Sequence, residues 1–178
     1  VERSRGLGDV YKRQVKEHTT TRNNSGIFDV SHMGQLFLKG GDELTNDLQK
    51  IFPIDLAKIS INQSKYSFLM KDNGGIYDDL IITKLKDGYM IILNAACKEA
   101  DLNILKSKIG EKYQINLSDN LSLIAIQGPK SKGVLDSIVP GVTKLKFMNG
   151  NQFKYNDLDI YITTVSYTHL RAHETSLH

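Results

Sequence analysis

The sequence predicts an α+β fold in which helices pack on antiparallel sheets. Short runs of β-branched and aromatic residues recur along the chain, and turn residues separate many of them, so hairpins are the expected connections. The turn residues lie at 72–75, 87–88, 118–120 and 156–157. The expected strands lie near residues 27–38, 65–70, 76–85, 89–93, 114–117, 121–127, 152–155 and 158–163.

Three segments carry apolar residues at helical spacing, and each stops before a proline or a glycine. They contain Leu44, Leu48 and Ile51 in the first, Leu102, Leu105 and Ile109 in the second, and Val134, Leu135 and Ile138 in the third. Helices at these positions are expected to pack on the sheets.

Two adjacent carboxylates, Asp78 and Asp79, lie at the start of an expected strand, directly after a glycine turn. The apolar run that follows indicates a strand covered on both faces, so at least one acid is expected to point into a pocket. Neighbouring strand side chains face opposite ways, which makes one acid a site candidate and the other scaffold. The simpler alternative is a hairpin turn that uses Asp and Gly for backbone geometry alone. A calcium loop does not fit, because 72–75 lacks alternating oxygen ligands and a closing glutamate.

Three further segments accompany the acid pair: Gly-Ile-Phe-Asp-Val-Ser-His-Met-Gly at 26–34, Asn-Ala-Ala at 94–96, and Leu-Ile-Ala-Ile-Gln-Gly-Pro at 123–129. Each has a structural interpretation when taken singly. Ser31 and His32 are sequence neighbours that point apart on a strand, which argues against nucleophilic catalysis. Asn94 either caps the next helix or reaches a ligand. Gly128 and Pro129 fit a turn from a strand into a helix.

Taken in this order and at these separations, the four segments resemble the amino-terminal half of the aminomethyltransferase of the glycine cleavage system, the T-protein. The resemblance covers about residues 15–164. It implies an incomplete folate-binding domain of the T-protein type. It also implies transfer of an aminomethyl carbon from the lipoyl group of the H-protein to tetrahydrofolate, with release of ammonia. This truncated chain by itself is expected to be inactive.

The resemblance also implies site residues. Asp79 is carried over as the catalytic group, and Asp78 is the alternative if the strand phase is one residue out. Met33, Tyr66, Asp78 and Asn94 are the positions expected to contact folate, while no metal ligand is expected. Without the resemblance, Tyr66 reads equally well as a core aromatic with a bonded hydroxyl.

A related folate-binding module is the alternative function. Iron–sulfur assembly factors and the folate domains of sarcosine and dimethylglycine dehydrogenases belong to this class. The assembly factors carry a cysteine-glycine motif in a later part that this sequence does not include, so the sequence of that part would separate the two classes.

The ends of the chain do not follow the pattern. Residues 1–14 lack an amphipathic period, and 165–178 lack the glycine-rich, acidic continuation of a T-protein, so both are interpreted as non-native flanks; genuine divergent tails are the alternative. The net charge of +3 includes an excess of two basic residues in 1–14, which leaves no electrostatic footprint for nucleic acid. A single cysteine, Cys97, and the lack of a bilayer-length apolar run predict a cytoplasmic protein without a membrane partner.

Overall fold

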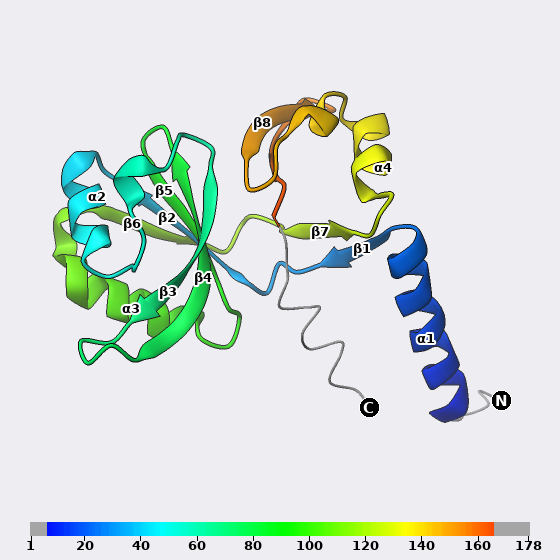
Figure 1. The fold of residues 1–178 in the computed structure, drawn as a ribbon, viewed down its shortest axis with the longest axis horizontal. Helices are drawn as coiled ribbons and strands as arrows, with labels where there is room; N and C mark the ends of the chain where they lie inside the picture. The colour runs from blue at the N-terminus through cyan, green and yellow to red at the C-terminus, as the bar shows by residue number, and fades with distance from the viewer. Residues whose placement is uncertain (1–6, 166–178) are drawn as a thin grey trace.

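The computed structural model describes residues 7–165, with side chains from residue 12 onward. Its largest unit is a five-stranded antiparallel sheet in the order β3-β4-β5-β2-β6, and the helices α2 and α3 cover one face of it (Figure 1). The strands are β2 (Gly34–Lys39), β3 (Ser64–Met70), β4 (Ile76–Leu85), β5 (Gly88–Leu93) and β6 (Gln114–Ser118). The helices of this unit are α2 (Asp42–Gln49) and α3 (Lys98–Ile109), with the 3₁₀ turns η1 (Leu56–Lys58) and η2 (Gly110–Lys112).

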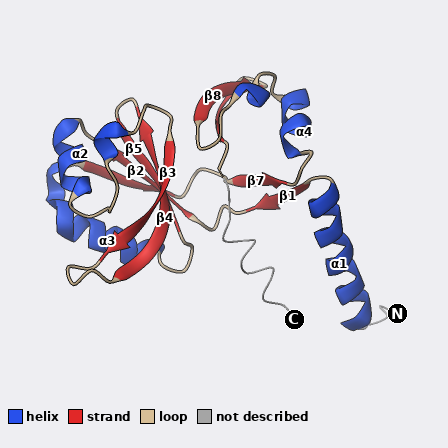
Figure 2. Ribbon diagram, in the orientation of Figure 1, coloured by secondary structure: helices blue, strands red, loops and turns tan. Residues whose placement is uncertain are grey.

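Two smaller antiparallel sheets lie beside the large one (Figure 2). The first pairs β1 (Gly26–Asp29) with β7 (Ile124–Gln127), and the second pairs β8 (Gly150–Tyr155) with β9 (Leu158–Thr163). Between β7 and β8 lie α4 (Ser131–Ile138) and η3 (Val142–Lys144). Backbone bonds tie the β8 end to the large sheet, because the Ser64 amide donates to the Met148 carbonyl at 2.8 Å and the Gly150 amide donates to the Asn62 carbonyl at 2.7 Å.

The core lies between the large sheet and its two helices. Strand alternation sends every second residue of β4 toward α3, so Leu80 and Ile82 are buried while Lys84 at the strand end is half-buried. In α2 and α3, helical spacing places the apolar residues on the side that faces the sheet, where they are buried. The buried cluster includes Leu36, Leu38, Leu44, Leu48, Leu80, Ile82, Tyr89, Ile91, Leu93, Leu102, Leu105 and Ile109. The α+β class with antiparallel sheets is therefore confirmed.

Three of the four predicted turn regions form hairpins, joining β3 to β4, β4 to β5 and β8 to β9. Asn156 and Asp157 in the last hairpin both have positive φ, which Asn and Asp tolerate better than most residues. The turn at 118–120 does not form a hairpin, because β6 and β7 belong to different sheets.

The single strand expected over 27–38 is wrong, because the chain turns between β1 and β2. The Asp29 carboxylate accepts hydrogen bonds from the Ser31 amide at 3.0 Å and the Ser31 hydroxyl at 2.6 Å, and the Met33 amide donates to the Val30 carbonyl at 3.0 Å. Such an aspartate turn competes with the strand ladder. It sends β1 to pair with β7, while β2 pairs with β5 and β6.

The helix α1 (Leu7–Asn23) was not anticipated from the sequence. Its described side chains from Lys12 to Thr20 are all exposed. A helix that buries no face has no apolar periodicity, so the sequence carries no pattern that would predict it. Its carboxyl end packs closely on Gly128, where an added Cβ would lie 2.4 Å from the Thr21 carbonyl oxygen. Gly128 also has φ +110°, which residues with a side chain rarely adopt. Both the backbone conformation and the close contact with α1 therefore require glycine at this position.

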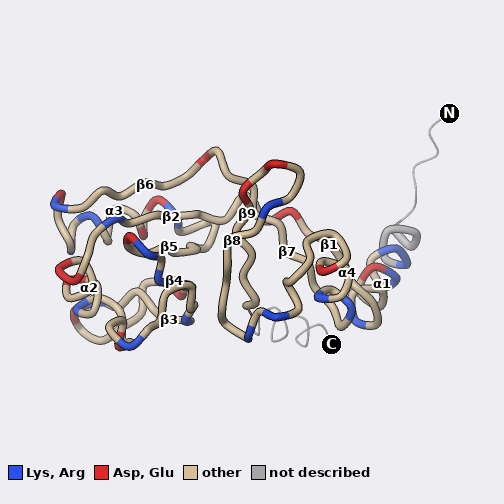
Figure 3. The backbone as a smooth tube through the Cα atoms, turned by 90° about the horizontal axis from the view of Figure 1, so that it is seen from above, with Lys and Arg blue, Asp and Glu red and all other residues tan. Residues whose placement is uncertain are grey.

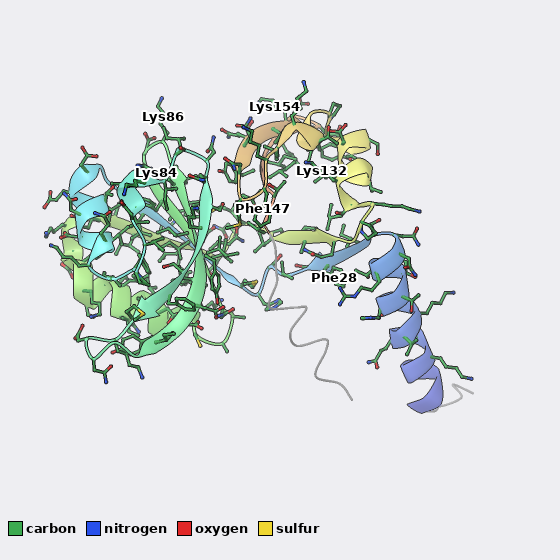
Figure 4. The ribbon with its side chains drawn as sticks, viewed as in Figure 1. Phe28, Lys84, Lys86, Lys132, Phe147 and Lys154 are labelled. Carbon is green, nitrogen blue, oxygen red and sulfur yellow. The ribbon has the colours of Figure 1, made fainter. Side chains whose placement is uncertain are left out.

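Charged residues of both signs are scattered over the sheets and helices (Figure 3). Large apolar side chains are exposed on and beside the smaller sheets; Ile27 on β1 is 72% exposed and Phe147, in the loop before β8, is 68% exposed. Figure 4 places Phe28 on β1 and Phe147 before β8, away from the helix-covered core. Within residues 7–165, no helix is long and apolar enough to cross a membrane.

Removing residues 1–14 should leave the melting temperature nearly unchanged, because Lys12, Arg13 and Gln14 are exposed and contribute nothing to the core. Removing residues 1–23 is the matched comparison. It deletes the Thr21 carbonyl region that packs on Gly128, so the melting temperature should fall by several degrees. Thermal unfolding followed by circular dichroism distinguishes the two. A fall of several degrees on the shorter deletion would show that the first fourteen residues dock.

Candidate active site

The two adjacent acids lie near the start of β4 and face opposite sides of the sheet. Asp79 is paired with Phe68 of β3, and Asp78 with Leu69. The register shifts after Leu69, where Tyr77 is the extra residue of a β-bulge. Asp78 shares the helix-covered face with Leu80, and Asp79 shares the opposite face with Ile81. The expected alternation of the two carboxylates is therefore present.

Tyr66 and Asp79 form the contact on the helix-free face. Tyr66 pairs with Ile81 and lies diagonally across from Asp79, and its hydroxyl donates to Asp79 Oδ2 at 2.5 Å. Burial raises the pKa of the Tyr66 hydroxyl, and the bond to Asp79 and the charges of both acids raise it further. Tyr66 thus stays protonated and donates to the carboxylate. The ring of Phe68 meets the Tyr66 ring edge-on at 5.1 Å, which adds an apolar wall beside the acid.

Asn94 joins the two carboxylates from the end of β5. Its Nδ2 donates to Asp79 Oδ1 at 2.8 Å and to Asp78 Oδ1 at 2.9 Å, and lies 3.1 Å from the Asp79 carbonyl oxygen. The helix-cap alternative is wrong, because the residue at the N-cap of α3 is Cys97 and no side chain caps that helix. The amide instead reaches both faces of the sheet at once.

Asp78 points toward the amino-terminal turn of α3, where it meets Asp101 and Cys97. Asp101 is 2% exposed, and its carboxyl group lies within hydrogen-bonding reach of Asp78. Burial raises the pKa of Asp101 to about 7, and the neighbouring Asp78 adds to the shift. The charge of Asp78 also raises the pKa of the Cys97 thiol, which therefore stays protonated.

Asp101 is the residue that sequence reasoning missed. The signal available was an acid directly before Leu102, inside a run of residues with helical spacing that faces the core. A carboxylate at such a position is rarely buried unless it has a partner. The partner of Asp101 is Asp78 on β4, and the sequence of α3 alone does not predict this contact.

Met33 joins this region through strand register. Gly34, the first residue of β2, pairs with Leu93, so Met33 lies next to Asn94 at the same end of the two strands. Gly34 also lets α3 approach β2 closely, because an added Cβ would lie 2.9 Å from Cβ of Lys98 on α3. The five sequence-predicted positions therefore gather at one end of β2, β4 and β5, with Tyr66 reaching in from β3. His32 is exposed, and Ser31 is engaged in the turn with Asp29.

A model of the GCVT N-terminal domain matches residues 8–177. The chain belongs to this family. The match extends beyond both ends of the region 15–164, and the resemblance to T-proteins drawn from the four segments is confirmed.

Members of the family with aminomethyltransferase names are similar to the chain over most of its length. The aminomethyltransferase of Halothermothrix orenii is 35% identical over 161 residues, which cover 89% of this chain and 45% of the relative. That of Flavobacterium psychrophilum is 45% identical over 131 residues, covering 72% and 36%. The crystal structure of glycine cleavage system aminomethyltransferase T from Bartonella henselae superposes with a TM-score of 0.75 at 36% identity, covering 86% and 42%. The chain thus spans less than half the length of these GCVT-family proteins.

A surface hollow of this GCVT-family chain lies away from the acids. Its volume is about 370 Å³, and it is open to solvent. The lining residues are Ile54, Asp55, Lys58, Ile59, Gln63 and Lys65. None of the sequence-predicted site residues lines this hollow.

Replacing Asn94 with alanine should lower the free energy of unfolding by roughly 1–3 kcal/mol, since both carboxylates lose a shared donor in a half-buried setting. Asn103→Ala is the matched control, because Asn103 is exposed on α3 and should change stability by less than about 0.5 kcal/mol. Urea unfolding of both variants provides the measurement. Equal stability of the two variants would mean that the Asn94 bridge contributes nothing.

Proposed function

We propose that this chain is the amino-terminal, folate-binding part of an aminomethyltransferase that transfers the aminomethyl carbon from lipoylated H-protein to tetrahydrofolate. Membership of the GCVT family supports the reaction class. The observation that carries the proposal is the Asp79 carboxylate, held from two sides by the Tyr66 hydroxyl and the Asn94 amide. Exposed apolar residues on β1 and β7, such as Ile27 and Ile124, support the view that further chain completes the protein.

The chemistry requires proton movement between nitrogen and sulfur. Two folate nitrogens replace the sulfur and the amino group on one carbon, so two carbon–nitrogen bonds form, one carbon–sulfur and one carbon–nitrogen bond break, and ammonia leaves. The two protons lost by folate go to the lipoyl sulfur and to the departing amine. A positioned carboxylate that accepts or relays one of these protons contributes a factor of about 10² to 10⁴ in rate. Asp79 takes that role in the proposal.

The surroundings of Asp79 suit a flat heterocycle with a polar edge. Tyr66 and Phe68 supply aromatic surface next to the carboxylate, and Asn94 supplies an amide. Pockets for such ligands combine apolar walls with a few placed polar groups. Met33 at the neighbouring strand end is the further contact in the proposal, while Asp78 faces the helix side and acts through Asn94.

The partners in this proposal are tetrahydrofolate and the lipoylated H-protein, and the proposed cellular location of the protein is the cytoplasm. A related folate-binding module remains the second candidate, supported by the same Asp79 and Tyr66 arrangement without any feature specific to aminomethyl transfer. The sequence that continues this chain discriminates the two, since a cysteine-glycine motif there would indicate an assembly factor.

The 178-residue chain alone should bind tetrahydrofolate weakly and turn over negligibly with loaded H-protein, because Asp78 and Asp79 are only half-buried in it and the chain spans 45% and 42% of the length of two of its relatives. Isothermal titration of the chain with tetrahydrofolate measures the affinity, and the complete protein is the comparison. Micromolar binding by the chain itself would contradict the incompleteness of the site.

In the complete protein, Asp79→Asn should lower the rate of methylenetetrahydrofolate formation by about 10² or more, since the amide keeps the shape but loses the basic oxygen. Asp78→Asn should have the smaller effect, because its side chain faces α3. Thermal melts of both variants check that folding survives.

Near-normal turnover of Asp79→Asn would remove Asp79 from the catalytic role. A strong loss confined to Asp78→Asn would assign the proton transfer to the helix-facing acid instead.

A further inference from the structure

Two neighbouring acids, Asp78 on β4 and Asp101 on α3, each have one buried carboxylate oxygen that lacks a hydrogen-bond donor among the described residues. Oδ2 of Asp78 and Oδ2 of Asp101 are both buried and have no hydrogen-bond partner among the described residues. The two carboxyl groups are nevertheless within hydrogen-bonding reach of each other. Two ionised carboxylates in contact repel, and their buried oxygens stay unsatisfied. A single proton between them removes both penalties.

The proton belongs on Asp101. Asp78 Oδ1 accepts hydrogen bonds from the Asp79 amide at 2.9 Å and from Asn94 Nδ2 at 2.9 Å, and both donors stabilise its ionised form. Asp101 is more deeply buried, and no hydrogen-bond donor to its carboxyl group is found among residues 7–165. In the described part of the chain, no lysine or arginine forms an ion pair with either acid, although the Cys97 thiol lies near Asp78 as a weak donor.

We propose that Asp101 is a positioning residue for the active site, whose neutral carboxyl group donates a hydrogen bond to Asp78 and thereby fixes the carboxylate that orients Asn94 and Asp79. The chain of contacts runs from Asp101 on α3 to Asp78 on β4, then through the Asn94 amide to Asp79 Oδ1. Loss of the Asp101 proton places two charges together on the helix side. The Asp78 carboxylate is then pushed from the position in which it accepts from Asn94.

The arrangement makes the site sensitive to pH. The charged or titratable groups near Asp101 are Asp78 and, beyond it, Cys97 at the N-cap of α3, Asp79 on β4 and Tyr66 on β3. In the folded chain Asp101 keeps its proton up to about pH 7, whereas an aspartate in an unfolded chain releases it near about pH 4. The folded state binds more protons between these values, so the stability contributed by this group falls as pH rises through that window.

The first test measures the proton and does not depend on the proposed function. Aspartate side chains of this 178-residue chain are labelled with ¹³C at Cγ, and their carboxyl resonances are followed from pH 4 to pH 9. One buried carboxyl should titrate near pH 7, and that resonance should be absent in Asp101→Asn. Asp119→Asn is the control, because Asp119 is exposed and its loss should leave the buried titration unchanged. A titration near pH 7 that persists in Asp101→Asn overturns the assignment, as does its absence from the unsubstituted chain.

The second test rests on the proposed function and uses the complete protein. Asp101→Ala removes the donor and should lower kcat by about tenfold or more, with KM for tetrahydrofolate changed much less. Asp101→Asn retains a donor at every pH, so it should recover most of the loss and abolish the decline in kcat that the unsubstituted enzyme shows above about pH 7. Equal kcat in Asp101→Ala and the unsubstituted enzyme, or an unchanged pH profile in Asp101→Asn, would overturn the positioning role. An unsubstituted enzyme without aminomethyl transfer would refute the proposed function, and the carboxyl titration would still decide where the proton lies.

Discussion

The arrangement of the site depends on one amide group. Asn94 Nδ2 bonds both Asp78 and Asp79, although strand alternation sends these side chains to opposite faces of the sheet. This is possible because Asn94 lies just past the end of β5, so its backbone does not pair with a neighbouring strand and its side chain is not held to one face of the sheet. A residue one position earlier would be a buried apolar member of the core, as Leu93 is. The amide thereby couples a helix-facing acid to an acid on the open face.

The same junction connects the site to the core. Leu80 and Ile82 follow the acid pair on β4 and pack with Leu102 and Leu105 of α3, so the apolar contacts that hold the helix also determine where Asp101 lies. On the other face, the β3–β4 register brings the Tyr66 hydroxyl to Asp79. Displacement of β4 by one residue would exchange the two acids and break both sets of contacts. The register of a single hairpin is therefore a condition for the whole cluster.

Much of this arrangement could be predicted from local pattern. Three of the four turns, the positions of α2, α3 and α4, and the opposite orientation of Asp78 and Asp79 each follow from spacing over a few residues, although Val134 and Ile138 of α4 are exposed and do not join the core. The break between β1 and β2 could not, because Asp29 and Ser31 read equally well as strand or turn until their side chains are placed. Helix α1 has exposed side chains and no periodic signal. Asp101 escaped notice because its significance lies in a contact with a strand more than twenty residues away along the chain.

The pairing of β1 with β7 joins two segments that lie far apart in the sequence. These strands are adjacent in space, yet the entire five-stranded sheet lies between them in sequence. Contacts between distant segments require closure of a long loop, and its entropic cost is met only after the intervening chain has become compact. The β3–β4 and β4–β5 hairpins close short loops, so we expect them to form before the β1–β7 ladder. The small sheet therefore holds together two segments that the whole large sheet separates in sequence, at a larger loop-closure cost than either hairpin.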